Sequence, residues 1–400
     1  MVRWFEMLRH LARRAGMLGA CLFALPPGVG ATDGGWQTIA DPPPIAVGAD
    51  GRPHAASCSG YPGTDPGFRF WVRQGDPTKL AVVFDGGGAC WDDLTCSNPF
   101  GGDGVLTFYS PDIPPGSEPT RYGGLLDFAN PANPVRDWTV VAIPYCTADV
   151  HLGSTDRGYT MKGHPGLPRQ FTLHHRGYDN FMVVLDWITR HVPQGVSDLL
   201  VTGASAGGYG AAGNFPWLAQ AYPQARLSVL ADASQGVSTA GFDAGTPGRG
   251  SWNPQLAPWA FGANPMAVRS YEMIRQGASA YPAGRFAQYT TTMDSVQISF
   301  YTVMRLLHGP SDDPSCPGPL KDWNHQMLGH LASDRALLPN FRSYVAPGTS
   351  HTIIGDNAFY APMGSKPAVA SWLGAMLDPT GSLDWSSVAC PGCLRAPRCP

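Results

Sequence analysis

The sequence predicts an α/β protein with a mostly parallel, doubly wound sheet. Two observations lead to this prediction. Short, nearly continuous apolar runs recur along the chain, and stretches with helical periodicity lie between some of them. Continuous Val, Leu and Ile runs are typical of parallel strands covered on both faces, and alternation of strand and helix is typical of a doubly wound sheet.

The composition supports a globular protein. Hydrophobic residues make up 43% of the 400 residues, and 12 are Trp, which argues against disorder although 49 are Gly and 39 are Pro. The net charge is −3 and no basic stripe is present, so nucleic acid is not expected as a partner.

Residues 1–31 are predicted to be a signal peptide. An arginine-rich start is followed by the apolar run "AGMLGACLFAL", which is too short to span a bilayer, and by the small-x-small pattern Val29-Gly30-Ala31. Cleavage there would leave a single domain, 32–400, in a secreted or periplasmic protein without an integral membrane segment. The alternative is an uncleaved membrane anchor.

The cysteines predict disulfides. Removing the signal peptide removes Cys21 and leaves an even number, namely Cys58, Cys90, Cys96, Cys146, Cys316, Cys390, Cys393 and Cys399. An even number in an exported chain favours disulfides, but spacing alone does not decide their connectivity. The Cys390-x-x-Cys393 spacing also suits zinc or redox chemistry, yet no second pair at zinc spacing accompanies it, so neither a metal nor a cofactor is predicted.

Five apolar runs are expected to be strands, in the order Leu80–Phe84, Trp138–Ile143, "DLLVTGAS", "ARLSVLADAS" and "FRSYVAPGTSH". Helices are expected at "YDNFMVVLDWITRHV", at "YGAAGNFPWLAQAYPQ", where Pro216 must kink the helix or begin a new segment, and at "AVASWLGAML". The region of about 234–292 lacks clear alternation and is expected to be an insertion over the carboxyl edge of the sheet. A cysteine-containing tail occupies about 379–400.

Ser205 is predicted to be a nucleophile. The pattern Gly203-x-Ser205-x-Gly207 matches the nucleophile-elbow motif, which is weak alone in so glycine-rich a chain. Here the serine also lies between an expected strand and an expected helix, as the motif requires, and the small neighbours permit a sharp turn.

A serine hydroxyl needs a base, and the base needs an acid. Of the histidines after Ser205, only His351 closely follows an expected strand; His308, His325 and His330 lie in polar stretches. The acid should lie between the serine and the histidine. Asp232 directly follows one strand, and Asp294 lies shortly before an apolar segment, so position alone leaves both open.

The transition state of acyl transfer also requires hydrogen-bond donors for its oxyanion. One donor is expected from Ala206, the residue after the nucleophile, and another from an early glycine turn. The stretch "FDGGGACW", with Gly86, Gly87 and Gly88, supplies such a turn directly after a strand.

Together these residues resemble the pectin acetylesterase/Notum family of serine hydrolases. The matching segments span roughly Cys58 to Ile354 and are "FDGGGACWDDLTC", "IPYCTADVHLGS", "HHRGYDN", "VTGASAGGYGA", "DSVQISFY" and "PGTSHTI". The resemblance implies an α/β-hydrolase fold and cofactor-independent hydrolysis of carboxylic esters.

Carried over residue by residue, the resemblance implies Ser205 as nucleophile, His351 as base and Asp294 as acid. It implies Gly87, Gly88 and Ala206 as oxyanion donors, and disulfides pairing Cys90 with Cys96 and Cys58 with Cys146. Ala89 stands where animal members have an aromatic residue, which leaves the shape of the acyl pocket open.

The function predicted is therefore deacylation of a small-molecule or polysaccharide ester by an exported serine esterase, with acetyl as one possible acyl group. A lipase or polyester depolymerase is the alternative if the Trp252–Phe261 segment forms a long apolar groove. A catalytically silent binding protein on the same fold is the other alternative, against which the apparently complete set Ser205, Asp294 and His351 argues.

Overall fold

The computed structural model describes residues 29–31, 35–100, 107–310, 316, 318–390 and 393. The predicted signal peptide lies outside these residues except for its last three, which form strand β1 (Val29–Ala31). In the part of the chain that is described, no helix is both long and apolar enough to cross a membrane.

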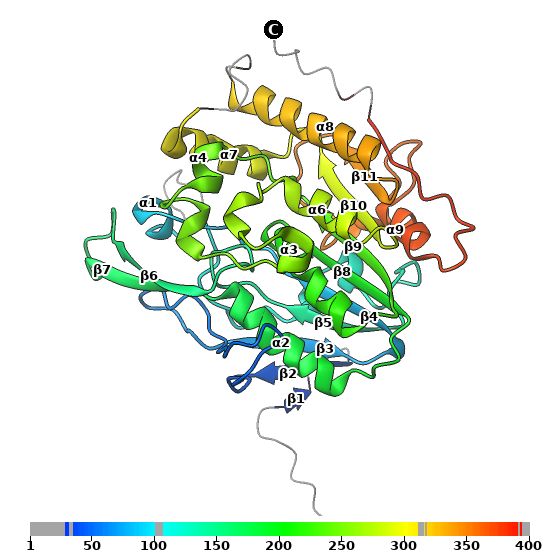
Figure 1. The fold of residues 1–400 in the computed structure, drawn as a ribbon, viewed down its shortest axis with the longest axis horizontal. Helices are drawn as coiled ribbons and strands as arrows, with labels where there is room; N and C mark the ends of the chain where they lie inside the picture. The colour runs from blue at the N-terminus through cyan, green and yellow to red at the C-terminus, as the bar shows by residue number, and fades with distance from the viewer. Residues whose placement is uncertain are drawn as a thin grey trace, which may run out of the picture.

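A nine-stranded sheet forms the centre of the described structure (Figure 1). Its spatial order is β1, β2 (Trp36–Ala40), β3 (Arg69–Arg73), β5 (Trp138–Ile143), β4 (Asp76–Phe84), β8 (Asp198–Ala204), β9 (Arg226–Asp232), β10 (Arg285–Thr291) and β11 (Phe341–Ala346). In this spatial order, the six strands β5, β4, β8, β9, β10 and β11 pair in parallel. Strands β1, β2 and β3 pair antiparallel at one edge of the sheet. The predicted mostly parallel sheet is confirmed.

All five predicted strands are present, as β4, β5, β8, β9 and β11, and every residue of β5 is buried. Strand β10 was not predicted, because its sequence "RFAQYTT" carries polar residues. Gln288 is nevertheless buried, and its amide donates to the carbonyl of Ser234 at 3.2 Å. The segment expected as an insertion, 234–292, thus ends in an integral strand, and only its part before Arg285 lies outside the sheet.

Two predicted helices pack side by side on one face of the sheet. Helix α2 (Gly177–His191) buries most of one side, and α3 (Ala206–Ala221) runs without a break through Pro216 and packs on β8 and β9. The third predicted helix is α9 (Val369–Leu377). The other helices are α1 (Asp93–Cys96), α4 (Ala240–Ala244), α5 (Pro258–Phe261), α6 (Glu272–Ala280), α7 (Ser295–His308) and α8 (Pro319–Leu337).

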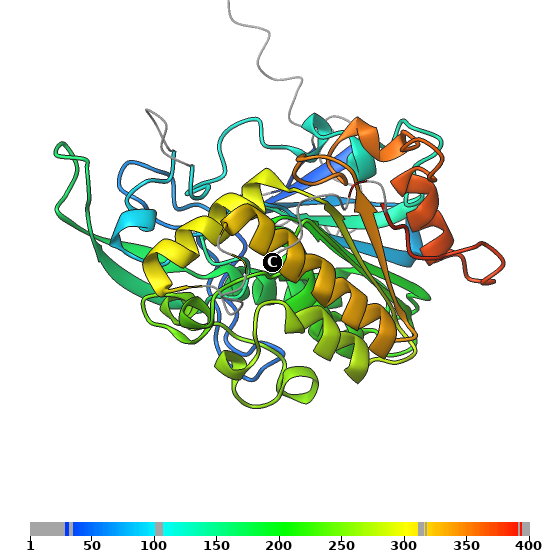
Figure 2. The same cartoon turned by 90° about the horizontal axis from the view of Figure 1, so that it is seen from above.

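A separate two-stranded hairpin and the C-terminal tail lie outside the nine-stranded sheet. The hairpin of β6 (Thr155–Thr160) and β7 (Gln170–His175) projects away from the body in both views (Figures 1 and 2). At the β11 edge of the nine-stranded sheet, Val388 of the C-terminal tail bridges to Tyr344. The amide of Val345 donates to Val388 at 2.8 Å, and the amide of Val388 donates to Ser343 at 2.8 Å.

The disulfides implied by the resemblance are both present. Cys58 pairs with Cys146, which follows β5, and Cys90 pairs with Cys96 across the short helix α1. Cys390 pairs with Cys393 in the tail, and Cys316 is also disulfide-bonded. The tail pair is therefore neither a zinc ligand pair nor a free dithiol in this structure.

Candidate active site

The candidate site lies where the winding of the sheet changes direction. From β4 the chain passes to β5 on one side and later to β8 on the other side, so the loops after β4 and β8 diverge above the sheet. Such switch points are the usual ligand sites of open α/β sheets. Here the two loops are the glycine turn and the Ser205 turn, and a Cβ added at Gly86 would lie only 3.0 Å from the Ser205 Cβ.

Ser205 occupies a strained turn between β8 and α3. Its φ is +57°, a conformation that non-glycine residues seldom adopt. Small neighbours permit it, because a Cβ at Gly203 would meet the carbonyl of Gly207 at 2.2 Å, and one at Gly207 would meet the carbonyl of Phe84 at 2.0 Å. The amide of Ser205 donates to the carbonyl of Asp232 at 2.8 Å, which ties the turn to β9.

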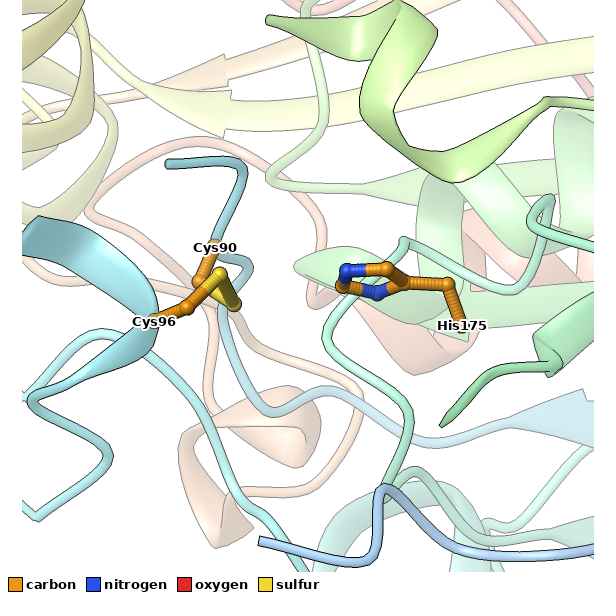
Figure 3. Close-up of side chains that lie close together, drawn as sticks. All are labelled: Cys90, Cys96 and His175. Atoms are coloured by element: carbon orange, nitrogen blue, oxygen red, sulfur yellow. A yellow bond between two sulfur atoms is a disulfide. The ribbon is translucent and has the colours of Figure 1, made fainter. Parts of the chain in front are cut away.

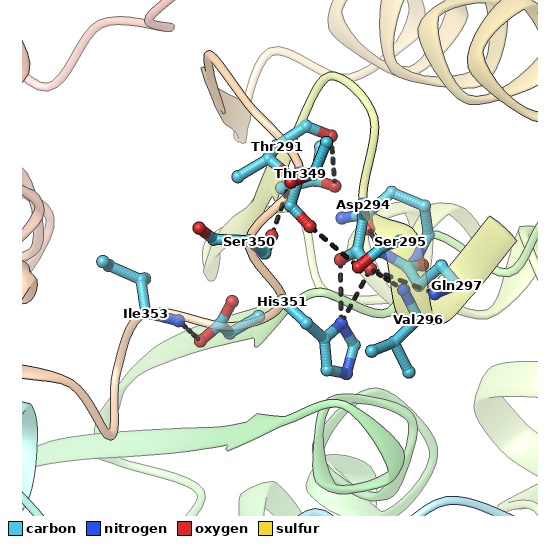
Figure 4. A network of polar contacts seen from close by, with 12 residues as sticks. Thr291, Asp294, Ser295, Val296, Gln297, Thr349, Ser350, His351 and Ile353 are labelled. Carbon is cyan, nitrogen blue, oxygen red and sulfur yellow. Dashed lines mark hydrogen bonds and ion pairs between the residues drawn. The ribbon is translucent and has the colours of Figure 1, made fainter. Parts of the chain in front are cut away.

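His351 and Asp294 meet beyond the ends of β11 and β10 (Figure 4). The Nδ1 atom of His351 lies 2.8 Å from Oδ2 and 2.9 Å from Oδ1 of Asp294. The surrounding backbone joins the two loops, since the amide of Ser295 donates to the carbonyl of Thr349 at 3.1 Å. The two side chains that the resemblance pairs are thus in contact.

The Asp294 carboxylate is held on several sides. It is fully buried and caps α7, accepting from the amides of Val296 at 3.1 Å and Gln297 at 3.0 Å. The side chain of Gln297 adds a third donor at 2.9 Å and also donates to Gln235 at 2.7 Å. These donors fix the orientation of the carboxylate toward the histidine.

Asp232, the other candidate acid, has different partners. Its Oδ2 accepts from the amides of Ile353 at 2.7 Å and Ile354 at 2.9 Å, in the loop that follows His351. Its Oδ1 has no hydrogen-bond partner among the described residues. Burial raises the pKa of the Asp232 carboxyl to about 7, against the lowering effect of the two amides. Asp232 therefore holds the histidine loop through its backbone, and no hydrogen bond joins it to the imidazole among the described residues.

Ser205 and His351 line the same cavity. The Nε2 atom of His351 is buried and has no hydrogen-bond partner within the described structure, so it makes no bond to the serine hydroxyl here. In ligand-free hydrolases this contact is often long and tightens when substrate binds.

The expected oxyanion donors lie beside the serine. Gly88 and Ala206 line the cavity, whereas Gly87 is not part of its wall. The amides of Gly87, Gly88 and Ala206 donate to no other backbone group among the described residues, so they are available. Gly88 has a φ of +77°, and a Cβ there would meet the carbonyl of Phe108 at 2.0 Å, so this turn requires glycine.

The cavity wall is mainly apolar and aromatic. Its larger apolar side chains are Trp91, Val150, Leu152, Val237, Phe242, Trp252, Met273, Val296, Phe300, Met304 and Trp323. The sequence pointed to Trp252–Phe261 as a possible groove, but only Trp252 of that range lines the cavity. Phe261 packs in the core against Phe215 instead. Ala89 is part of the wall, where its small side chain leaves space.

One structural residue was missed from the sequence. His151 is buried beneath the glycine turn, with its Nε2 2.9 Å from the carbonyl of Asp85 and its ring against Phe84. Burial lowers the pKa of His151 to about 4, so its ring is neutral. Its segment "IPYCTADVHLGS" carries the resemblance, but that did not reveal its place under the turn.

Cys90, Cys96 and His175 lie close enough together to suggest a metal site (Figure 3). The two sulfur atoms are joined in a disulfide, so they are not available as thiolate ligands. His175 already contacts the carbonyl of Thr147 at 3.0 Å and the hydroxyl of Tyr159 at 2.8 Å. This cluster therefore braces the glycine turn and does not fit a metal.

Comparisons with known proteins give one family match and a similar fold. Residues 52–242 match the family model described as Pectinacetylesterase. Two crystal forms of the Wnt deacylase Notum from Drosophila are similar in structure, each at 17% identity. Their TM-scores are 0.55 and 0.53, covering 84% and 83% of this chain and 93% and 92% of theirs. No match was found among curated proteins.

Proposed function

Residues 52–242 match the pectinacetylesterase family, and from that premise we propose that the chain hydrolyses carboxylic esters with Ser205 as nucleophile, His351 as base and Asp294 as acid. The contact between His351 and Asp294, at 2.8 Å, is the observation that best supports this assignment. It links two loops that only the fold brings together, beside a serine in a strained turn.

In the proposed reaction, Ser205 Oγ attacks the ester carbonyl while His351 Nε2 takes the hydroxyl proton. Asp294 holds Nδ1–H and stabilises the imidazolium that forms. The amides of Ala206 and Gly88 bind the oxyanion, with Gly87 as a further donor from the same turn. When the carbonyl reforms, the C–O bond to the alcohol breaks, and the alcohol leaves with the proton from His351. A water molecule then attacks the acyl-enzyme with His351 again as base, which releases the acid and restores the serine.

The cavity favours an apolar acyl group. Aromatic and aliphatic side chains surround the space next to Ser205, and Ala89 leaves room there. Burial of each methylene contributes about 0.8 kcal/mol, so esters of medium-length acids should react faster than acetates. This favours the second candidate, a lipase-like or polyester-hydrolysing enzyme, over strict deacetylation of a carbohydrate.

The disulfides support an exported enzyme. The described cysteines are oxidised, as in proteins that fold outside the cytosol. We propose that residues 1–31 direct export and that the mature domain acts in the periplasm or outside the cell.

The test measures hydrolysis of p-nitrophenyl esters from acetate to decanoate by the purified mature protein and by Ser205→Ala. The variant should lose about 10⁶-fold in turnover, as when the nucleophile of a serine hydrolase is removed, with an unchanged thermal unfolding midpoint. Rates that rise with chain length to an optimum beyond acetate would support the apolar acyl group. A folded wild-type protein without activity on any ester would instead indicate a silent binding protein.

A further inference from the structure

One charged side chain interrupts the apolar wall of the cavity. Arg249 begins the short helix Arg249–Trp252, between β9 and β10, and its side chain is only 2% exposed. It lines the same cavity as Ser205 and His351. A buried guanidinium requires hydrogen-bond acceptors, because an unpaired donor in a protein interior is costly.

The protein pairs this guanidinium incompletely. Both hydrogen bonds of Arg249 come from Nη2, to the carbonyls of Pro265 at 3.2 Å and Met266 at 3.4 Å. Its Nε lies 3.9 Å from Asp243 Oδ1 and has no hydrogen-bond partner among the described residues. Nη1 likewise makes no hydrogen bond among the described residues. The guanidinium therefore keeps donors to offer.

Asp243 does not compensate for this deficit, because its carboxylate is occupied by other groups. Arg269 Nε lies 2.6 Å away, and the hydroxyls of Ser238 and Ser270 donate at 2.6 and 2.5 Å. These two serines also belong to the cavity wall, but their hydroxyls are already bonded. Arg249 thus still lacks acceptors, whereas the polar groups beside it are paired.

A second unpaired donor lies in the same wall. The indole Nε1 of Trp91 is buried without a hydrogen-bond partner among the described residues. Trp252, by comparison, donates its indole N–H to the carbonyl of Cys90 at 2.6 Å. Apart from His351 Nε2, which the proposed reaction uses as the base, these two unpaired groups of the wall are both donors, so the partner that they lack is an acceptor.

The charges around Arg249 favour a neutral acceptor over an anion. The guanidinium lies near two acidic groups, Asp243 and Glu272, and one further cation, Arg269, all of which influence its pKa. Together with Arg249 itself, these groups carry two positive and two negative charges, so no net positive charge remains to attract an anion. A carboxylate would also lose its hydration in an apolar cavity.

Resting on the proposed esterase function, we propose that Arg249 binds a neutral oxygen of the substrate's acyl group, such as a carbonyl, other than those of the ester that is cleaved. The acyl group would then be an oxo-acyl or acyloxy-acyl chain, not a plain hydrocarbon. Arg249 would select this group and take no part in bond breaking.

The test compares p-nitrophenyl hexanoate with its 3-oxo, 4-oxo and 5-oxo analogues, using the mature wild-type protein, Arg249→Met and Arg269→Met. Methionine keeps the apolar bulk but removes the donors. Arg269→Met is the matched control, because Arg269 binds Asp243 but is not part of the cavity wall. For at least one oxo ester, kcat/KM relative to hexanoate should fall about 10- to 100-fold in Arg249→Met, the range for a hydrogen bond to a charged group, and stay unchanged in Arg269→Met.

Equal ratios in the wild type and Arg249→Met, with hexanoate still hydrolysed, would overturn the proposal while leaving the esterase function intact. A fall in both variants would also overturn it, because the effect would then come from Asp243. If Arg249→Met does not fold, binding of the methyl oxohexanoates to Ser205→Ala is measured by calorimetry. Tighter binding than methyl hexanoate for one of them supports the proposal, and equal or weaker binding for all three contradicts it.

Discussion

The ends of β9 and β10 carry two buried aspartates with different tasks. Asp294 has the imidazole of His351 and three protein donors around its two oxygens. Asp232 has two backbone amides on one oxygen and none on the other. Both hold the histidine loop, one through the side chain and one through the main chain. Burial near the histidine therefore does not identify the acid of the candidate triad, whereas contact with Nδ1 of the histidine does.

The largest expected difference between the two aspartates is in turnover. Asp294→Asn should reduce kcat by about 10⁴-fold, because the amide presents the wrong hydrogen-bond pattern to Nδ1 and cannot stabilise the imidazolium. Asp232→Asn keeps an oxygen acceptor for Ile353 and Ile354, so its kcat should stay within about tenfold of the wild type. Ester hydrolysis at equal concentrations of folded protein measures both. The reverse pattern would make Asp232 the acid.

Removal of the acceptor at Asp232 tests the other half of the comparison. Asp232→Ala leaves the amides of Ile353 and Ile354 buried and unpaired, at a cost of about 2–6 kcal/mol in unfolding free energy, from about 1–3 kcal/mol for each amide. Urea unfolding measures this loss, with Asp232→Asn as the conservative control that should recover most of it. An alanine variant as stable as the wild type would show that these two hydrogen bonds contribute little.

The smallest expected effect is a change in pH dependence. The folded pKa of Asp232 is raised to about 7 from 3.8, so between these values the folded state binds a proton that the unfolded state lacks. This group makes stability decrease as the pH rises from about 4 to 7, by at most about 1.4 kcal/mol per unit. Asp232→Asn should therefore gain stability relative to the wild type across that interval. A constant difference in unfolding free energy would contradict the raised pKa.

The sequence predicted the strands of the sheet's centre because continuous apolar runs have few alternatives. It did not predict β10, because this strand contains Gln288 and several threonines. These polar side chains are buried, and the hydrogen bonds that compensate for their burial form only in the folded protein. The order of residues placed the serine and the histidine at strand ends. The choice between Asp232 and Asp294 depended on the family resemblance, because contact between residues 57 positions apart is set by the strand order of the sheet.

The cavity was less predictable than the candidate triad. Its wall comes from separate segments, including Trp91, Val150, Phe242, Trp252 and Phe300, and each residue alone has the appearance of an ordinary core residue. Arg249 carried no signal, since a single arginine in a Gly- and Pro-rich segment is expected to be solvated. Its significance follows from burial, which depends on how the segment between β9 and β10 folds over the site.

The bridge between Val388 and β11 bears on how the protein avoids self-association. A terminal strand offers unpaired amides and carbonyls to which another chain can add by β-pairing, a common first step in aggregation. The tail occupies part of that row on β11, at Ser343 and Val345, a few residues before His351. Proteolytic loss of the tail would uncover this row, so a nicked enzyme would become prone to aggregation while its nucleophile remained chemically intact.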